Sequence, residues 1–281
     1  MSPGATTDVT LDDFVRLQTP EGEALLAQLR GEALEEAQLL EVLARYRKSY
    51  PPALVAAAVE LTRVRRRAAE KFADADALWF TRTALEMASA EAVARHTAAR
   101  FAGRRRVLDL CCGAGGDALA LADCAGQVTA VERDPLVLAM ARANARARHR
   151  HDRIDFVRAD VIDFMPTAPL LLGRPDAIFI DPSRRHGDRR VSRRDDAYSP
   201  PLAWCLELVR HAPAVGIKAA PALDYAALPV EAEVEIISLH GECKAAMLWL
   251  GDVRTGARRA TVLPAGATLT DAGATSDAVG D

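Results

Sequence analysis

The sequence predicts an α/β fold, with a mostly parallel sheet covered by helices and a helical N-terminal domain in front of it. Two observations support this. From residue 106 onwards, short apolar runs alternate with helical segments, which is typical of a parallel sheet with helices on both faces. Before that point, apolar residues recur only at helical spacing. We expect the helical domain to cover residues 1–77 and the sheet-containing domain to cover residues 78–255.

Prolines and leucine spacing define the N-terminal helices. Helices usually start at or just before a proline, and a Pro-Pro pair interrupts them. Pro51 and Pro52 form such a break. The expected helices are 20–30, 34–50 and 53–72, and a further helix, 89–101, leads into the first strand.

Residues 107–117, Val-Leu-Asp-Leu-Cys-Cys-Gly-Ala-Gly-Gly-Asp, are the most informative stretch. The apolar run 106–110 predicts a buried strand, and the glycines that follow allow a tight turn and close approach of a ligand to the main chain. The next helix, 118–122, would point its free N–H groups at that ligand. A second strand, 128–132, ends at Glu132, whose carboxylate can accept hydrogen bonds from two ribose hydroxyls. This order predicts a nucleotide-binding βαβ unit.

The turn favours S-adenosylmethionine over a dinucleotide as the ligand. Its glycines do not follow the Gly-x-Gly-x-x-Gly spacing, because Cys111 occupies the first position. Asp109 precedes the turn, where it would repel a pyrophosphate but suits the α-amino group and sulfonium of adenosylmethionine. A lone glycine turn is usually structural. The order of acid, turn, helix, strand and acid is much harder to explain in that way.

Two later strands also end in acids, at Asp160 and Asp181. The carboxyl ends of parallel strands line one crevice, which is where ligands bind in open α/β sheets. Asp160 could there accept a hydrogen bond from the adenine amine. Each acid taken singly could instead cap a helix or sit in a surface turn. Four acids in or at the ends of successive strands favour a shared ligand site.

At these residues the chain resembles the class I S-adenosylmethionine-dependent methyltransferases. It is most similar to the RNA cap guanine-N2 methyltransferase (trimethylguanosine synthase) group and to bacterial relatives of that group with a THUMP-like C-terminal domain. The resemblance covers about residues 78–253 and implies a Rossmann-like sheet of seven strands, the last antiparallel. It rests on Asp109-x-x-Cys112-Gly113-x-Gly115-Gly116, on Asp134-Pro135 with Ala141-Arg-Ala-Asn144, and on the strand leading to Asp181-Pro182.

The resemblance implies S-adenosyl-L-methionine as the cofactor. In the resembled families a segment before the sheet closes over the donor, which makes Phe80 and Thr81 candidates for that lid. Alternatively, Trp79 and Phe80 only pack the helical domain onto the sheet. The expected cofactor-binding residues are Phe80, Thr81, Asp109, Cys111, Gly113, Gly115, Asp117, Glu132, Arg133, Asp160, Val161 and Asp181.

The chain departs from the group after the fourth strand. The eukaryotic relatives have Pro-Pro-Trp there, and the Trp stacks on the target guanine, whereas this chain has Asp181-Pro182-Ser183-Arg184. We take these four as candidate catalytic residues. Asp181 would accept a hydrogen bond from the amine that is methylated, Pro182 would hold the turn rigid, Ser183 would shape the pocket, and Arg184 could stack on a base.

An arginine-rich loop follows, over residues 184–196. It is too long and polar for a simple connection, and its six arginines can bind phosphate or stack on bases. Its acids could instead pair with those arginines internally. The expected substrate-binding residues are Arg184, Arg185, Arg189 and Arg190.

The charge distribution favours a polyanionic partner. Residues 1–45 carry nine acids and three bases, and residues 222–281 carry nine acids and four bases, so the middle has a net charge of +8 in a chain of net charge −3. A basic catalytic face suits a nucleic acid. The alternative is a solvated surface in which arginine simply replaces lysine.

The C-terminal part completes the predicted sheet. We expect a helix at 201–209, a fifth strand at 215–218 and a closing hairpin of strands 233–239 and 245–250. From residue 256 the chain lacks apolar periodicity, which predicts a flexible tail over 256–281. We expect no THUMP-like domain like that of the bacterial relatives within these residues: either the chain lacks it or the sequence is a fragment.

The sequence therefore predicts a methyltransferase acting on an exocyclic or ring nitrogen of a purine in RNA. The alternatives are a methyltransferase for a protein or a small anionic molecule, and a donor-binding module without catalysis. The five cysteines form no Cys-x-x-Cys pair and have no histidine cluster beside them, so no metal is expected. No long apolar run and no signal peptide are evident, which predicts a cytoplasmic protein without membrane contact.

Overall fold

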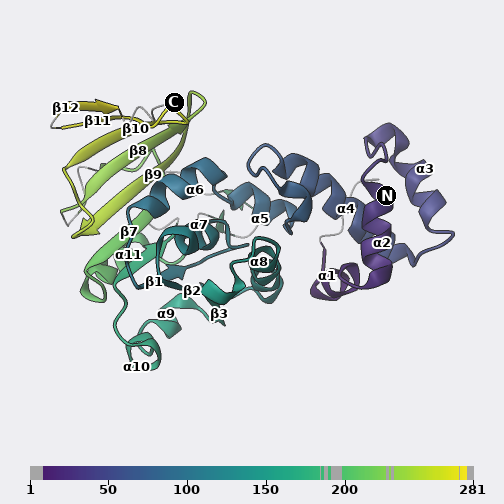
Figure 1. Ribbon diagram of the computed structural model, residues 1–281, viewed down its shortest axis with the longest axis horizontal. Coiled ribbons are helices and arrows are strands. Elements are labelled where there is room, and N and C mark those ends of the chain that lie inside the picture. Colours follow the sequence, from purple (N-terminus) through teal and green to yellow (C-terminus); the bar gives the residue numbers. More distant parts are fainter. Residues whose placement is uncertain are drawn as a thin grey trace.

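The computed structural model describes residues 9–183, 185–186, 189–190, 198–225, 228, 231–271 and 273–276. Helices α1–α4 gather at one end of an elongated molecule, and strands β10–β12 lie at the other (Figure 1). Among the described residues, no helix is both long enough and apolar enough to cross a membrane.

The N-terminal helices are α1 (Leu11–Leu17), α2 (Pro20–Leu29), α3 (Glu36–Tyr46) and α4 (Pro52–Ala68), followed by the 3₁₀ turn η1 (Ala75–Ala77). The helical N-terminal region is therefore confirmed. Thr10 and Thr19 cap α1 and α2 by accepting hydrogen bonds from backbone N–H groups. The Phe14 ring packs edge-on against Trp79 at 5.1 Å between centroids, which anchors these helices to the segment in front of the sheet.

One sheet of ten strands organises the rest of the chain, in the order β12-β11-β10-β8-β9-β7-β4-β1-β2-β3. The strands β3, β2, β1, β4 and β7 are parallel, and β9 runs antiparallel between β7 and β8. These seven strands form the predicted sheet with its last strand antiparallel, so the fold class is confirmed. The bounds are β1 (Arg106–Leu110), β2 (Gln127–Glu132), β3 (Ile154–Arg158), β4 (Ala177–Ile180), β7 (Ala214–Ala219), β8 (Glu233–Leu239) and β9 (Glu242–Gly251).

Helices cover both faces of the sheet (Figure 1). Alternation along β1 sends Val107 to the face packed by α6 and α7, and Leu108 and Leu110 to the opposite face, packed by α9 and α11. Asp109 shares the face of Val107. The helices are α5 (Arg82–Met87), α6 (Glu91–Ala99), α7 (Gly116–Cys124), α8 (Pro135–Ala147), α9 (Val161–Phe164), α10 (Ala168–Leu172) and α11 (Leu202–Glu207), with 3₁₀ turns η2 (His151–Arg153) and η4 (Leu208–Arg210).

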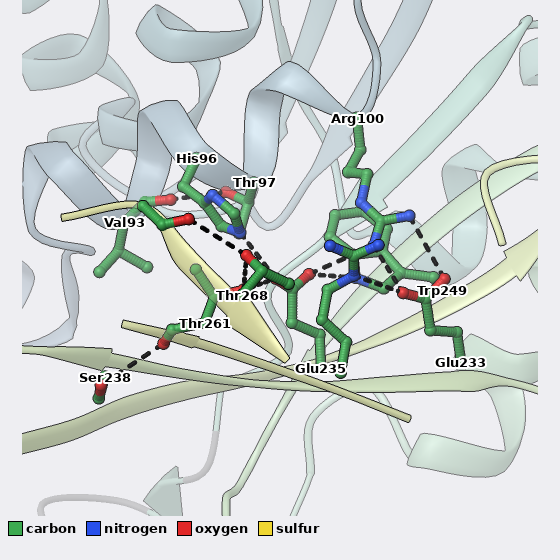
Figure 2. A network of polar contacts seen from close by, with 12 residues as sticks. Val93, His96, Thr97, Arg100, Glu233, Glu235, Ser238, Trp249, Thr261 and Thr268 are labelled. Atoms are coloured by element: carbon green, nitrogen blue, oxygen red, sulfur yellow. Dashed lines mark hydrogen bonds and ion pairs between the residues drawn. The ribbon is translucent and has the colours of Figure 1, made fainter. Parts of the chain in front are cut away.

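The prediction of a flexible tail from residue 256 is wrong for the described part of that segment. It forms β10 (Arg258–Leu263), β11 (Ala267–Thr270) and β12 (Gly273–Ser276), which extend the sheet beyond β8. Two of the three inward positions of β10, Arg259 and Thr261, are polar, and the third is Leu263. Thr261 is 1% exposed and donates to Glu235 at 2.7 Å, whereas Val262 is 48% exposed (Figure 2). The strand therefore lacks the apolar-inward alternation by which strands are recognised in a sequence.

Part of the arginine-rich loop has a described backbone. The short strands β5 (Arg185–His186) and β6 (Arg189–Arg190) pair antiparallel as a hairpin. Three of the four predicted substrate-binding arginines therefore lie on this hairpin. Arg184 lies outside the described residues.

Candidate functional site

A cavity of about 500 Å³ opens at the carboxyl ends of β1, β2, β3 and β4. This is where an open α/β sheet places its ligand. The helix α5 and the first turns of α7, α8 and α9 complete its wall. Of the predicted site residues, those on this wall are Thr81, Cys111, Gly113, Asp117, Glu132, Arg133, Asp160, Val161, Asp181 and Ser183.

The glycine turn at residues 111–116 adopts left-handed backbone at three positions. Cys111, Gly113 and Gly115 have φ angles of 63°, 56° and 85°. A Cβ on Gly115 would lie 3.2 Å from the Cβ of Ala141, so this glycine allows α8 to approach the turn, and it is not on the cavity wall. A Cβ on Gly113 would meet no protein atom within 4 Å. The absence of a side chain at Gly113 therefore leaves room for a ligand.

Glu132 fixes the turn from the end of β2. Its Oε2 accepts from the backbone N–H of Gly113 at 3.1 Å, and its Oε1 accepts from that of Asp134 at 2.9 Å. An ionised carboxylate has about four lone-pair sites, so Glu132 keeps acceptor capacity toward the cavity. Such a group is suited to bind hydroxyls of a ligand.

Asp109 lies beneath the cavity rather than on its wall. Its side chain is fully buried, and within the described structure neither carboxylate oxygen has a hydrogen-bond partner. Burial raises the pKa of Asp109 well above its usual range, and the nearby carboxylates of Asp117 and Asp181 add to the effect. A buried carboxylate without a partner is costly, so a cationic ligand above it would be stabilising.

A continuous set of polar contacts connects two acids on the cavity wall. Asp117 Oδ2 accepts from Ser89 Oγ at 2.9 Å, and Lys218 Nζ donates to Ser89 Oγ at 2.8 Å and to Asp181 Oδ2 at 2.6 Å. Burial also raises the pKa of Asp117, while the Lys218 ammonium acts in the opposite direction. Neither Ser89 nor Lys218 was predicted as a site residue. Lys218 could have been found from its position at the end of the apolar strand 215–218, because a lysine in a buried strand usually has an acidic or polar partner.

Asp160 and Asp134 both cap helices at the edge of the cavity. Asp160 accepts from the backbone N–H of Ile162 at 3.0 Å at the start of α9, and its carboxylate lies 3.6 Å from Arg133. Asp134 caps α8 in the same manner and also lines the cavity, although sequence reasoning did not select it. The capping bond uses Oδ1 of Asp160, and Arg133 lies 3.6 Å from Oδ2. Each carboxylate oxygen has two lone pairs, so Asp160 can cap α9 and still accept a hydrogen bond from a ligand.

Phe80 is not at the cavity, unlike the lid residue expected from the resemblance. Its ring is 1% exposed and stacks on Phe72 at 5.2 Å, so it packs the segment before α5 into the core. Thr81 is on the cavity wall and caps α5 by accepting from the backbone N–H of Ala84 at 3.0 Å. Adjacent extended residues point in opposite directions, so only one of these two can face the cavity.

Residues 181–183 connect the cavity to the arginine-rich loop. Ser183 and Ser199 form an antiparallel bridge through backbone hydrogen bonds of 3.0 and 2.8 Å, which closes the loop at its base. Both serines line the cavity, and Pro182 is buried beside it. The loop that carries the arginines therefore begins and ends at the cavity.

The two cysteines of the turn are neutral thiols. Burial raises the pKa values of Cys111 and Cys112, and the acids nearby raise them further. The charge at this site therefore comes from carboxylates, Arg133 and Lys218. In the described part of the chain, no group of histidine, cysteine and acidic residues is arranged to hold a metal.

Comparison with known proteins agrees with this geometry. Residues 104–186 match the family RNA cap guanine-N2 methyltransferase, and residues 8–68 match a domain of unknown function. A crystal structure of a methyltransferase candidate from Porphyromonas gingivalis W83 superposes with a TM-score of 0.62 at 21% identity, covering 80% of this chain and 60% of that one. The chain has the fold of a class I S-adenosylmethionine-dependent methyltransferase, and its sequence is similar to a methyltransferase family over residues 104–186.

Two curated relatives of this chain come from two strains of Mycobacterium tuberculosis, CDC 1551 / Oshkosh and H37Rv. Both are uncharacterized S-adenosylmethionine-dependent methyltransferases, 37% identical over 224 residues. The match covers 76% of this chain and 59% of each relative, so the chain spans about three fifths of their length.

Several arginines in the basic middle of the chain have structural partners. Arg104 pairs with Asp252, Arg150 with Asp123, and Arg148 with both Asp74 and Glu91. These charged side chains neutralise one another and are less available to a substrate.

Proposed function

We propose that the protein binds S-adenosyl-L-methionine in this cavity and methylates an exocyclic or ring nitrogen of a purine in RNA. The observation that carries the proposal is the position of Asp181. Its carboxylate lines the same cavity as the glycine turn, at the point where the arginine-rich loop begins. A proton acceptor, a donor site and a basic loop thereby meet in one place.

The charge of the cavity fits the donor. S-adenosylmethionine carries an ammonium and a sulfonium, and the site has the unpartnered carboxylate of Asp109 below it and that of Asp117 on its wall. Bound cations would favour the ionised forms of these buried acids. Glu132 would accept hydrogen bonds from the ribose, Asp160 would accept one from the adenine amine, and Val161 would pack against the ring.

S-adenosylmethionine supplies an activated methyl group when bound, so this chain has mainly to orient the acceptor and receive a proton. The lone pair of an exocyclic guanine amine is delocalised into the ring, which makes that nitrogen a poor nucleophile. The Asp181 carboxylate would accept a hydrogen bond from the amine and localise the lone pair. As the N–CH₃ bond forms and the S–CH₃ bond breaks, the amine proton passes to Asp181. Buried Pro182 holds the turn that aims the carboxylate.

Two features support RNA as the substrate. The matched family is named for RNA cap guanine-N2 methylation. The loop that carries Arg185, Arg189 and Arg190 is closed by Ser183 and Ser199, which line the cavity, and arginine binds phosphates and stacks on unpaired bases.

The test uses purified protein, methyl-labelled S-adenosylmethionine and separate pools of unmodified RNA, DNA and protein. We expect label in RNA, on a purine after nucleoside digestion. Asp181→Asn should lower turnover by roughly 100-fold or more while donor affinity changes by less than about threefold. Asp163→Asn, at an exposed position of α9, is the matched control and should keep full activity.

Other outcomes would overturn parts of the proposal. Label only in protein or in small molecules would exclude RNA as the substrate. Donor binding by calorimetry without label in any pool would exclude catalysis. Equal losses of turnover and donor affinity in Asp181→Asn would mean that Asp181 binds the donor instead of serving the acceptor.

A further inference from the structure

The neighbourhood of Lys218 and Asp181 is set by the sheet itself. Strands β4 and β7 are parallel neighbours, with Ile180 in register with Ile217. The next residue of each strand, Asp181 and Lys218, is therefore held side by side by the backbone. Lys218 Nζ donates to Asp181 Oδ2 at 2.6 Å, and the side chains are only 16% and 28% exposed.

Ser89 adds a second fixed contact to this ammonium. Lys218 Nζ lies 2.8 Å from the buried Ser89 Oγ, which in turn donates to Asp117 Oδ2 at 2.9 Å. Asp117 belongs to the first turn of α7, directly after the glycine turn. One ammonium and one hydroxyl thus connect the acid expected to face the donor with the acid expected to face the acceptor.

The ammonium also changes the electrostatics of the cavity. The carboxylates of Asp117, Asp181 and Glu132 are close enough to raise the pKa of the buried Asp109, and the Lys218 ammonium acts in the opposite direction. The contact with Lys218 also fixes the direction of the Asp181 carboxylate. Lys218 has its own protons directed at Asp181 and Ser89, so it is suited to hold the acceptor rather than to remove the proton.

We propose that Lys218 is a positioning residue for methyl transfer: its ammonium holds the Asp181 carboxylate directed at the acceptor, and Ser89 anchors that ammonium to Asp117. This inference rests on the proposed function. It adds a residue that neither the family match nor the resemblance assigns.

The main test is Lys218→Met, measured with labelled S-adenosylmethionine and RNA. We expect kcat to fall roughly 100-fold, while KM for RNA and the Kd of S-adenosylhomocysteine change by less than about threefold. Lys48→Met, at an exposed lysine after α3, is the matched control and should be unchanged.

Two further variants keep the test decisive if Lys218→Met folds poorly. Ser89→Ala leaves the ion pair in place but removes its anchor, so kcat should fall roughly tenfold while KM for RNA and the Kd of S-adenosylhomocysteine stay nearly unchanged. Lys218→Arg keeps the charge and should recover part of the kcat that Lys218→Met loses.

Urea unfolding tests the Lys218–Asp181 ion pair without any ligand. Each single variant, Lys218→Met or Asp181→Asn, leaves one charge without its partner. The double variant should therefore lose less unfolding free energy than the sum of the losses in the two single variants. A wild-type kcat in Lys218→Met, or in Ser89→Ala if the first variant does not fold, would overturn the inference while leaving the proposed function intact. A wild-type protein that methylates no RNA would overturn both.

Discussion

The side-chain amide of Asn144 donates a hydrogen bond to the backbone carbonyl of Ala114 at 2.9 Å, and so ties α8 to the middle of the glycine turn. The same amide exchanges two hydrogen bonds with the backbone of Trp79, at 2.7 and 3.0 Å. Asn144 is 1% exposed. One buried side chain thereby fixes both the turn under the cavity and the segment that leads into α5.

Replacement of Asn144 by leucine should weaken both stability and donor binding. Leucine has a similar size but leaves the Ala114 carbonyl and both backbone groups of Trp79 without this partner, which should cost roughly 2–4 kcal/mol of unfolding free energy. Because the turn loses its support, the Kd of S-adenosylhomocysteine should rise roughly tenfold. Urea unfolding and calorimetry measure the two effects. Gln38→Leu, at an exposed position, should leave both unchanged; an unaltered Asn144→Leu would refute this role.

The two left-handed glycines of the turn should respond differently to alanine. At Gly113 the added methyl meets no protein atom, so the loss of stability should be limited to the backbone cost of about 1–2 kcal/mol. The main effect of Gly113→Ala should be a loss of donor affinity, because the added methyl group occupies space in the cavity. At Gly115 the methyl also meets Ala141 at 3.2 Å, so stability should suffer more than at Gly113. Calorimetry with S-adenosylhomocysteine measures the affinity of each variant, and urea unfolding measures its stability. If the ratio of affinity loss to stability loss were the same for Gly113→Ala and Gly115→Ala, Gly113 would not be the glycine that makes room for the ligand.

Sequence reasoning succeeded where the signal is short-range. The glycine turn, the acids at strand ends and the prolines between helices lie within a few residues of what they determine. Contacts set by strand register were out of reach: Lys218 meets Asp181 only because β7 lies beside β4 in one register. Ser89, a buried serine between two helices, carried no local signal of its contact with Asp117.

The remaining errors also have physical causes. Phe80 and Thr81 are adjacent in sequence, and composition cannot say which of them faces a cavity. Residues 258–263 were predicted as part of a flexible tail because two inward residues of β10, Arg259 and Thr261, are polar and bind the buried carboxylates of Glu233 and Glu235. Apolar alternation does not identify a strand whose buried face is largely polar.

Removal of the loop arginines should weaken RNA binding through its salt-dependent part. Arg189→Ala with Arg190→Ala removes two cations from the hairpin at the base of which Ser183 and Ser199 pair. If both arginines contact phosphate, the plot of log K for RNA binding against log salt concentration should become less steep, its slope falling in magnitude by roughly 1 to 2. The affinity for the donor should not change. Filter binding of RNA across a salt series gives the slope. Arg47→Ala with Arg45→Ala, on the distant α3 segment, is the control, and a slope as steep as that of the wild type would exclude these arginines from the interface.

Glu233 should make stability depend on acidic pH. Its carboxylate is 1% exposed; burial raises its pKa, but hydrogen bonds from Arg100, the Thr255 backbone and Arg259 outweigh burial and lower the pKa from 4.5 to about 2 (Figure 2). As pH falls, Glu233 therefore binds a proton in the unfolded chain before it does so in the folded one. The ionised carboxylate contributes about 3 kcal/mol to the free energy of unfolding at pH values above its pKa in the unfolded chain. This contribution disappears as pH drops toward 2. Urea unfolding at several pH values should show Glu233→Gln less stable than the wild type at neutral pH and a narrowing gap below pH 4.5. Glu231→Gln, whose carboxylate is exposed, should lie close to the wild type throughout. A gap for Glu233→Gln that stays constant with pH would mean that packing, rather than the charge of this buried carboxylate, joins β8 to β10.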